Sequence, residues 1–133
     1  MPEHAPLTEP RRLTIPCARC GRTAVEVALL PASTPEQGPP RLAKDRLVRS
    51  GFLGLVHLYQ PADSLPSLYE AIASGDYAAA RSFDSDFVAY HCRACGQAYC
   101  QRCWRLDPPV FDDIFYDYTE GTCPAGHRQM VDD

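Results

Sequence analysis

The sequence predicts a small, metal-stabilised α+β fold with zinc-knuckle turns, short strands and an inserted helical hairpin. Three observations support this fold class. The chain has 133 residues, enough for one modest domain, and its 13 prolines indicate a loop-rich structure. Six of its seven cysteines occur in closely spaced pairs, and one segment has the apolar spacing of two short helices. A loop-rich core of this size commonly needs a metal ion to stabilise it.

Eight potential metal ligands fall into four pairs along the chain. Three pairs have the spacing Cys-x2-Cys and the last has Cys-x3-His, and together they are Cys17/Cys20, Cys92/Cys95, Cys100/Cys103 and Cys123/His127. Disulfides would leave one of seven thiols unpaired, whereas two tetrahedral zinc sites use every thiol. The pattern therefore predicts two Zn2+ ions bound by these eight residues. Four-ligand sites have no open coordination position, so we favour a structural role over an enzymatic one.

The residues around the pairs agree with knuckle-like turns. Gly21 follows the first pair and Gly96 follows the second, where the backbone turns sharply and a Cβ atom can obstruct it. Cys100 and Cys103 are expected to stand one helical turn apart, with both sulfurs on one side of a short helix. Trp104 is the only tryptophan and is expected to pack beside a zinc site.

The spacing leaves two ways in which the pairs could share metal ions. Only four residues separate the second pair from the third, so closing both around one ion would be cramped. The interleaved arrangement places Cys17, Cys20, Cys100 and Cys103 at one ion, and Cys92, Cys95, Cys123 and His127 at the other. The sequential arrangement joins the first pair to the second, and the third to the fourth. We favour the interleaved arrangement.

Prolines and ligand positions suggest the domain organisation. Residues 1–14 are expected to form a disordered N-terminal tail, and residues 15–133 a single domain with two zinc ions. Residues 31–86 are expected to form an insertion, made of a strand and a helical hairpin, between the first and second ligand pairs. Because 71 residues separate these two pairs, metal binding would fasten the N-terminal third of the chain to the C-terminal third.

Apolar periodicity places the first elements. Thr23–Pro31 alternates as a strand leaving the first knuckle, and Leu47–Tyr59 has the pattern of one bent strand or a hairpin. Ser64–Phe83 predicts two short helices. Gly75 breaks this segment and Asp76 can cap the second helix. In the first helix, Leu65, Leu68, Tyr69 and Ile72 share one face and are expected to belong to the core.

Two later segments lead into ligand pairs. Asp86–His91 is predicted to be a short strand running into the second knuckle. Pro109–Gly121 is aromatic and acidic, and it is expected to end in a strand that leads to the last pair. Its Asp112, Asp113, Asp117 and Glu120 alternate with aromatic residues and could dock a basic partner. We favour a solvated strand face whose opposite face is packed.

The charge balance is acidic. The formal net charge is −4, and seven thiolates with two divalent ions change it to about −7. Nucleic acid is therefore not an expected partner, because phosphate contacts need clustered basic residues. A local basic face around Arg41, Lys44, Arg46 and Arg49 leaves a nucleic-acid-binding zinc finger as an alternative. The N-terminus has no apolar signal region and no stretch has transmembrane length, so we expect a cytoplasmic protein without membrane contact.

The stretch HCRACGQAYCQRC (His91–Cys103) resembles the centre of FYVE-type zinc fingers and, less closely, of in-between-RING fingers. The cysteine spacing, the Cys-Gly step and an aromatic residue before the third pair support the likeness. The order of the eight ligands and the Cys123–Pro124 dipeptide also resemble the RING-like, cross-braced treble-clef group. The resemblance implies a treble-clef double zinc finger, and its close part covers about a tenth of the chain.

Departures from these families limit what the resemblance implies about function. FYVE fingers bind phosphoinositides through basic residues before the second pair, whereas this chain has Asp84 and Asp86 there, which would repel an anionic headgroup. RING ubiquitin ligases place a histidine in the middle of the ligand series and a bulky aliphatic residue after the first cysteine. This chain has its histidine last and Ala18 after Cys17.

Taken with the charge, these features predict a structural zinc-binding protein that acts as a protein-interaction module, with another protein as its partner. A RING-like ubiquitin ligase or adaptor is the first alternative, and it would expose an apolar groove between Ala18 and Pro124. A zinc deaminase is excluded because no histidine is followed by glutamate two residues later. His57 is expected to be a packed or edge-strand histidine, and His91 a strand residue.

Overall fold

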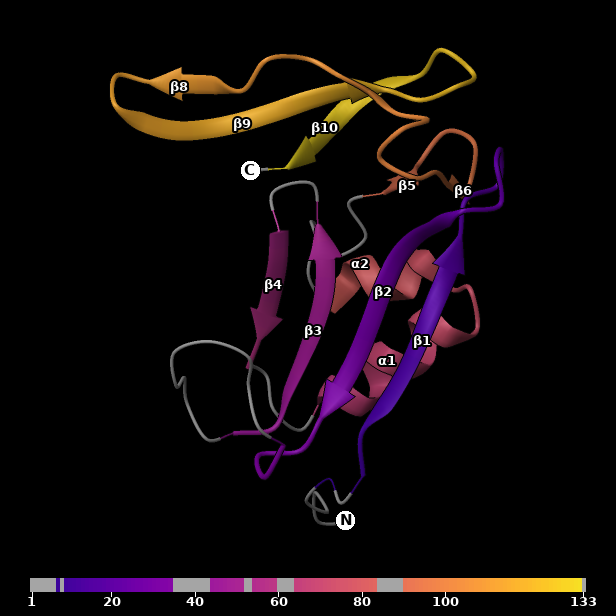
Figure 1. Cartoon of the computed structure of the whole chain (residues 1–133), viewed down its shortest axis with the longest axis vertical. Helices are drawn as coiled ribbons and strands as arrows, with labels where there is room; N and C mark the ends of the chain where they lie inside the picture. Colours follow the sequence, from indigo (N-terminus) through magenta and orange to yellow (C-terminus); the bar gives the residue numbers. More distant parts are fainter. Residues whose placement is uncertain are drawn as a thin grey trace.

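The computed structural model describes residues 7, 9–34, 44–51, 54–59, 64–83 and 90–132. They form a small domain of mostly antiparallel strands with two short helices, as the predicted α+β class requires (Figure 1). In chain order the elements are β1 (Arg11–Pro16), β2 (Thr23–Leu30), β3 (Arg46–Gly51), β4 (Gly54–Leu58), α1 (Leu65–Ala73), α2 (Tyr77–Phe83), β5 (His91–Cys92), β6 (Gln97–Ala98), β7 (Arg105–Leu106), β8 (Val110–Asp112), β9 (Phe115–Thr122) and β10 (Arg128–Asp132).

The strands form two main sheets and a short ladder. β1, β2, β3 and β4 pair in that order as an antiparallel sheet, and α1 and α2 cover one of its faces (Figure 1). The smaller sheet has the order β10-β9-β7, with β8 also paired to β9. In Figure 1 the smaller sheet and the β5–β6 ladder lie beyond one end of the large sheet, near the turn from β1 into β2. This junction is where the ligand pairs meet.

The main core lies between the large sheet and the helices. Alternation along β2 directs Val25, Val27 and Leu29 to one side, and all three side chains are buried. They belong to the same buried cluster as Leu68 and Ile72 of α1. The apolar stripe predicted for the first helix is therefore confirmed as core.

The N-terminal tail predicted over residues 1–14 is wrong for residues 11–14, which belong to β1. β1 pairs antiparallel with β2, with Leu13 opposite Val27, and Ile15 is buried in the main core. The prolines spaced through residues 1–10 suggested an irregular segment. The strand forms because β2 supplies backbone partners along its whole length, an effect that local sequence does not show.

The segment that follows β2 extends the same sheet. β3 and β4 form an antiparallel hairpin with Gly51 opposite Gly54, which confirms the hairpin alternative for this segment. β3 also pairs with β2. The predicted insertion therefore supplies two strands to a sheet whose first strands come before it. β3 pairs with the edge of β2 that β1 leaves open, because the backbone N–H and C=O groups at that edge need partners.

The two helices agree with the predicted helical hairpin, and Asp76 caps the second. The backbone N–H of Ala79 donates to Asp76 Oδ1 at 3.1 Å. We expect Asp76→Ala to lower the free energy of unfolding by about 0.5–2 kcal/mol, because it leaves a helix-terminal N–H without its acceptor. Ser64→Ala is the matched control, since the Ser64 side chain at the start of α1 makes no capping hydrogen bond. Urea unfolding measures both variants, and equal losses would contradict the assignment.

The basic stretch predicted near residues 41–49 is not a basic face. Arg46 is 1% exposed and Arg49 is 4% exposed, so neither guanidinium can meet a phosphate backbone. Lys44 is exposed, and Arg41 lies outside the described residues. Both arginines lie on β3, a central strand of the sheet, and their odd spacing places the two side chains on opposite faces of it.

The structure answers the expected strand over Asp86–His91 only in part, and it places His57 where it was expected. The strand predicted over Asp86–His91 falls mostly on residues 84–89, which lie outside the described part of the chain, although His91 does begin β5. His57 lies on β4, an edge strand of the large sheet, as expected for a non-catalytic histidine. Neither α1 nor α2 combines the length and apolarity that a membrane span requires.

Candidate metal centres

The first ligand pair forms the turn of a β-hairpin. The segment from Cys17 to Arg22 joins β1 to β2, with Cys17 N donating to Arg22 O at 2.6 Å and Gly21 N donating to Cys17 O at 3.0 Å. Gly21 has a φ of 78°, which L side chains rarely adopt. The space around its missing Cβ is open, so the backbone angle rather than crowding explains this glycine.

The second ligand pair makes a similar turn between β5 and β6. Gly96 N donates to Cys92 O at 2.8 Å, and Gly96 has a φ of 71°. Cys95 N also donates to the Cys92 sulfur at 3.4 Å. An N–H group that points at a sulfur stabilises its thiolate, which is the form that binds a metal ion.

The third and fourth pairs sit at the ends of the smaller sheet. Cys103 N donates to Cys100 O at 2.9 Å, so these cysteines are one helical turn apart, as predicted. Cys123 and His127 form the turn between β9 and β10, where Cys123 N donates to His127 O at 2.8 Å. His127 N donates to the Cys123 sulfur at 3.4 Å, repeating the arrangement of the second pair.

All eight predicted ligands are brought together in two groups, and the grouping is the interleaved one. One group contains Cys17, Cys20, Cys100 and Cys103, and the other contains Cys92, Cys95, Cys123 and His127. Within each group all four ligand atoms lie within 4.8 Å of one another. The sequential arrangement is therefore wrong, and the fold brings residues 17 and 103 to the same point.

The ligand distances suit a tetrahedral ion. Zinc–sulfur bonds near 2.3 Å place two sulfurs about 3.8 Å apart, and a sulfur and a nitrogen about 3.6 Å apart. The Cys20 and Cys100 sulfurs are 3.5 Å apart, and the Cys95 and Cys123 sulfurs 3.8 Å apart. His127 Nδ1 lies 3.2 Å from the Cys95 sulfur and 3.4 Å from the Cys123 sulfur. Each group can therefore hold one metal ion.

The pKa values of the thiols also agree with one metal ion in each group. Burial raises the pKa of the Cys17 thiol, but hydrogen bonds from three neighbouring backbone N–H groups outweigh it and lower the pKa to about 6. Burial and hydrogen bonds with the three other thiols of its group raise the pKa of Cys103 to about 12. The second group repeats this division, since the pKa of Cys123 is lowered to about 6 and that of Cys92 is raised. Clustered thiols ionise together only when a cation offsets their charges.

Backbone and side-chain contacts tie the two groups to each other and to the smaller sheet. Ala18 N donates to Ala98 O at 2.8 Å, joining the first turn to β6. Gln129 of β10 bridges the second turn, because its Nε2 donates to His91 O at 2.8 Å and its Oε1 accepts from Arg93 N at 3.1 Å. This role of Gln129 could not be predicted from the sequence, because an isolated glutamine has no spacing pattern.

Aromatic residues pack around the ligand turns. Trp104 follows the third pair directly and is 4% exposed, with its indole N–H donating to Tyr90 O at 3.1 Å. It meets the Tyr99 ring edge to face, with ring centroids 6.3 Å apart. His91 is buried in β5 and contacts Arg81 of α2, 2.6 Å from its Nδ1 to Nη1. The predicted positions of Trp104 and His91 are both confirmed.

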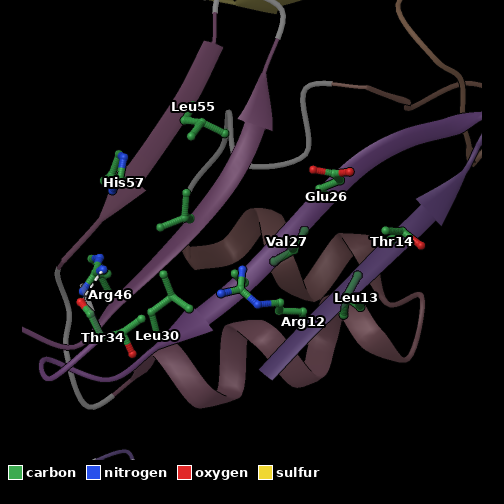
Figure 2. Close-up of a pocket in the computed structure, with 12 residues that line it drawn as sticks. Arg12, Leu13, Thr14, Glu26, Val27, Leu30, Thr34, Arg46, Leu55 and His57 are labelled. Carbon is green, nitrogen blue, oxygen red and sulfur yellow. Dashed lines mark hydrogen bonds between the residues drawn. The ribbon is translucent and has the colours of Figure 1, made fainter. Parts of the chain in front are cut away.

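A hollow of about 630 Å3 lies on the face of the large sheet that the helices leave open (Figure 2). Its floor includes Ala28, Leu30 and Val48, which form a second, smaller buried cluster. Arg46 lines one end, but its guanidinium donates to Pro31 O at 3.4 Å and Thr34 O at 3.1 Å. It therefore holds the loop after β2, and neither metal-ligand group of the described residues lies in this hollow.

The comparisons with known proteins give one match. A family model described as a domain of unknown function, DUF8328, matches residues 8–133. Neither a curated protein nor a solved structure matches the chain. The match includes both groups of ligands and nearly the whole chain. The protein therefore belongs to the DUF8328 family of domains of unknown function.

Proposed function

We propose that this domain is a zinc-binding structural module that acts through contacts with another protein. The observation that carries the metal assignment is the interleaved pair of four-ligand groups, each with its donor atoms within 4.8 Å. One group offers four sulfurs and the other three sulfurs and a ring nitrogen. Tetrahedral sites of four cysteines, or of three cysteines and a histidine, are typical of structural zinc.

The coordination number supports a structural rather than a catalytic role. Four protein ligands fill the tetrahedral positions of Zn2+, so a water or substrate molecule has no place on the ion. Binding of structural zinc is worth about 10–16 kcal/mol at neutral pH in small fingers. This is comparable to the whole net stability of an ordinary domain, about 5–15 kcal/mol. The ions would therefore decide whether the domain folds.

The position of the first group explains what zinc would hold together. Cys17 and Cys20 form the end of the large sheet, whereas Cys100 and Cys103 lead into the smaller one. An ion bound by all four joins the two sheets, and the second group closes β5, β6, β9 and β10 around the other. A cross-braced, treble-clef arrangement like that of RING and FYVE fingers is the finer form of this proposal.

The protein-interaction role is supported by exposed apolar residues on the smaller sheet. Phe111 is 58% exposed and Phe115 is 70% exposed, although both belong to paired strands. Burial of Arg46 and Arg49, two of the four residues of the basic stretch, argues against the nucleic-acid alternative. A RING-like adaptor stays an alternative prediction, which a ubiquitin-transfer assay with conjugating enzymes would test.

Native mass spectrometry of the purified chain tests the metal assignment. We expect two zinc ions per chain, which acid releases as the thiolates and His127 become protonated. The control is the same chain with its thiols alkylated after unfolding, which cannot rebind metal. A chain with one ion, or with no ion and with disulfides in place of free thiols, would overturn the proposed pair of structural zinc sites.

A further inference from the structure

Five exposed arginines lie on the turns that carry the Cys-x2-Cys pairs. Each of these three pairs has an arginine between its cysteines, and two more arginines stand two positions after a pair. We call them the turn arginines: Arg19, Arg22, Arg93, Arg102 and Arg105. None of their guanidinium groups makes an ion pair or a hydrogen bond with the described residues. Their charges therefore face solvent.

The fold gathers the turn arginines at the junction of the two sheets. Arg19 and Arg102 each precede a cysteine of the same ligand group. Arg105 of β7 pairs with Thr122, which directly precedes a cysteine of the other group. The hydrogen bond from Ala18 to β6 holds the first turn beside the second, as Figure 1 also shows. The turn arginines therefore share one part of the surface, around the two ligand groups.

The metal ligands do not need these arginines as partners. The Cys92 sulfur accepts from Cys95 N at 3.4 Å, and the Cys123 sulfur accepts from His127 N at 3.4 Å. Hydrogen bonds of this kind from backbone N–H groups stabilise a thiolate. Four of the seven cysteines are buried, whereas all the turn arginines are exposed. Neutralising the thiolates is therefore not a sufficient explanation for the turn arginines.

The charges of the molecule are divided unevenly. With Zn2+ bound, the two ligand groups would carry about −2 and about −1. The neighbouring Asp107 and Glu120 add two negative charges, and both form ion pairs with Arg128. The turn arginines and Arg128 outweigh all of these by about one charge, whereas the whole zinc-loaded chain carries about −7. The junction is therefore a basic end on an acidic protein, and its complement is acidic.

The chemistry of arginine and the covered aromatic rings indicate which acidic molecule fits. A guanidinium group donates two parallel hydrogen bonds to a carboxylate or a phosphate. Single-stranded nucleic acid also needs exposed aromatic rings on which its bases stack. In these turns Tyr99 is 6% exposed and Trp104 is 4% exposed, so neither ring can serve. A phosphate polymer would also meet the acidic remainder of the chain, whereas a protein segment can place its carboxylates at the arginines alone.

We propose that the turn arginines bind an acidic segment of a partner protein, whose aspartate and glutamate carboxylates pair with the exposed guanidinium groups. This inference rests on the proposed interaction role and deepens it by naming a surface and the charge of the partner. Exposed ion pairs contribute modestly one by one, so several arginines act together. The ligand groups set where these arginines lie, because each turn arginine is at most two residues from a ligand.

Titration of the isotope-labelled full chain with a short peptide, followed by NMR, tests the proposal. The probe alternates glutamate and glycine, and the matched peptide alternates glutamine and glycine. We expect the first peptide to shift the amide signals of the turn arginines and the second to leave them unchanged. Raising the ionic strength from about 0.05 M to about 0.5 M should remove the interaction, because exposed charges are screened.

Variants locate the binding surface. Arg19→Gln/Arg102→Gln should weaken binding of the glutamate peptide about tenfold, because it removes two of the five cations. Both residues are exposed and neither is a metal ligand, so the variant should keep its fold and its metal count. Arg12→Gln is the matched control. Arg12 is also exposed and makes no ion pair among the described residues, but it stands on β1, five positions before Cys17, and should leave binding unchanged.

Five results would overturn the proposal. No shift with the glutamate peptide, or equal binding of the two peptides, would show that the turn arginines do not select carboxylates. Tighter binding of a single-stranded oligonucleotide than of the glutamate peptide would indicate nucleic acid instead. Loss of metal in the Arg19→Gln/Arg102→Gln variant would assign the arginines to the metal groups. Shifts of the turn arginines on dilution of the chain alone would indicate a second copy.

Native mass spectrometry of the same samples separates this proposal from the zinc assignment. Two zinc ions without peptide binding would keep the structural sites and reject the arginine surface. Peptide binding at the turn arginines by a chain with no zinc would keep the surface and reject the structural sites.

Discussion

Replacing Cys103 by serine is expected to remove one zinc ion and to unfold the C-terminal half of the domain. The serine hydroxyl is not ionised at neutral pH, so three thiolates remain at a site that needs four ligands. The expected loss is a large part of the roughly 10–16 kcal/mol that structural zinc contributes, which is comparable to the whole stability of a typical domain. Native mass spectrometry gives the metal count, and circular dichroism on heating gives the cooperative transition.

Gln101→Ser is the matched control for this experiment. Gln101 lies between Cys100 and Cys103 and is exposed, and it belongs to neither group of ligands. We expect it to keep two zinc ions and an unchanged thermal transition. A Cys95→Ser/Cys103→Ser double variant removes one ligand from each group. If that variant melted like the unchanged protein and still held two ions, the structural role of zinc would be refuted.

Truncating Leu29 to alanine is expected to lower the free energy of unfolding of the zinc-loaded chain by about 2–5 kcal/mol. Leu29 is 1% exposed and belongs to the cluster between the large sheet and the helices. The loss combines apolar area returned to water with a cavity that the surrounding side chains cannot fill completely. Urea unfolding at a constant zinc concentration measures the change.

Leu55→Ala is the control of the same chemistry. Leu55 is 66% exposed on β4, so the same truncation creates no buried cavity and should change stability by less than about 0.5 kcal/mol. Similar losses for the two variants would mean that the large sheet and helices do not share a close-packed core. A loss confined to Leu29 would support a close-packed core between the large sheet and the helices.

The ligand pairs could be predicted because their information is local. Where only two or three residues stand between the two ligands of a pair, a turn is enough to bring both donor atoms to one ion. The same holds for Asp76, whose capping bond reaches only to Ala79. The strand Thr23–Leu30 and the apolar face of α1 follow from periodicity alone.

Other features depend on distant neighbours and could not be predicted. Residues 11–14 look irregular by themselves and become a strand because β2 pairs with them. Arg46 and Arg49 suggested a basic surface, but their position on a central strand buries them. The alternation in the β8–β9 hairpin suggested one packed face. This hairpin instead extends away from the junction of the two sheets, and Phe111 and Phe115 are exposed.

The sequence by itself determined which residues can bind metal and where the two helices and the strand after the first ligand pair lie, because spacing and periodicity act over a few residues. The tertiary structure decided that Cys17 and Cys20 join Cys100 and Cys103 rather than the nearer second pair. It also decided that Phe111, Ile114 and Phe115 of the β8–β9 hairpin are exposed. Both outcomes depend on how two sheets meet, and the packing that sets this joins residues eighty positions apart in the chain.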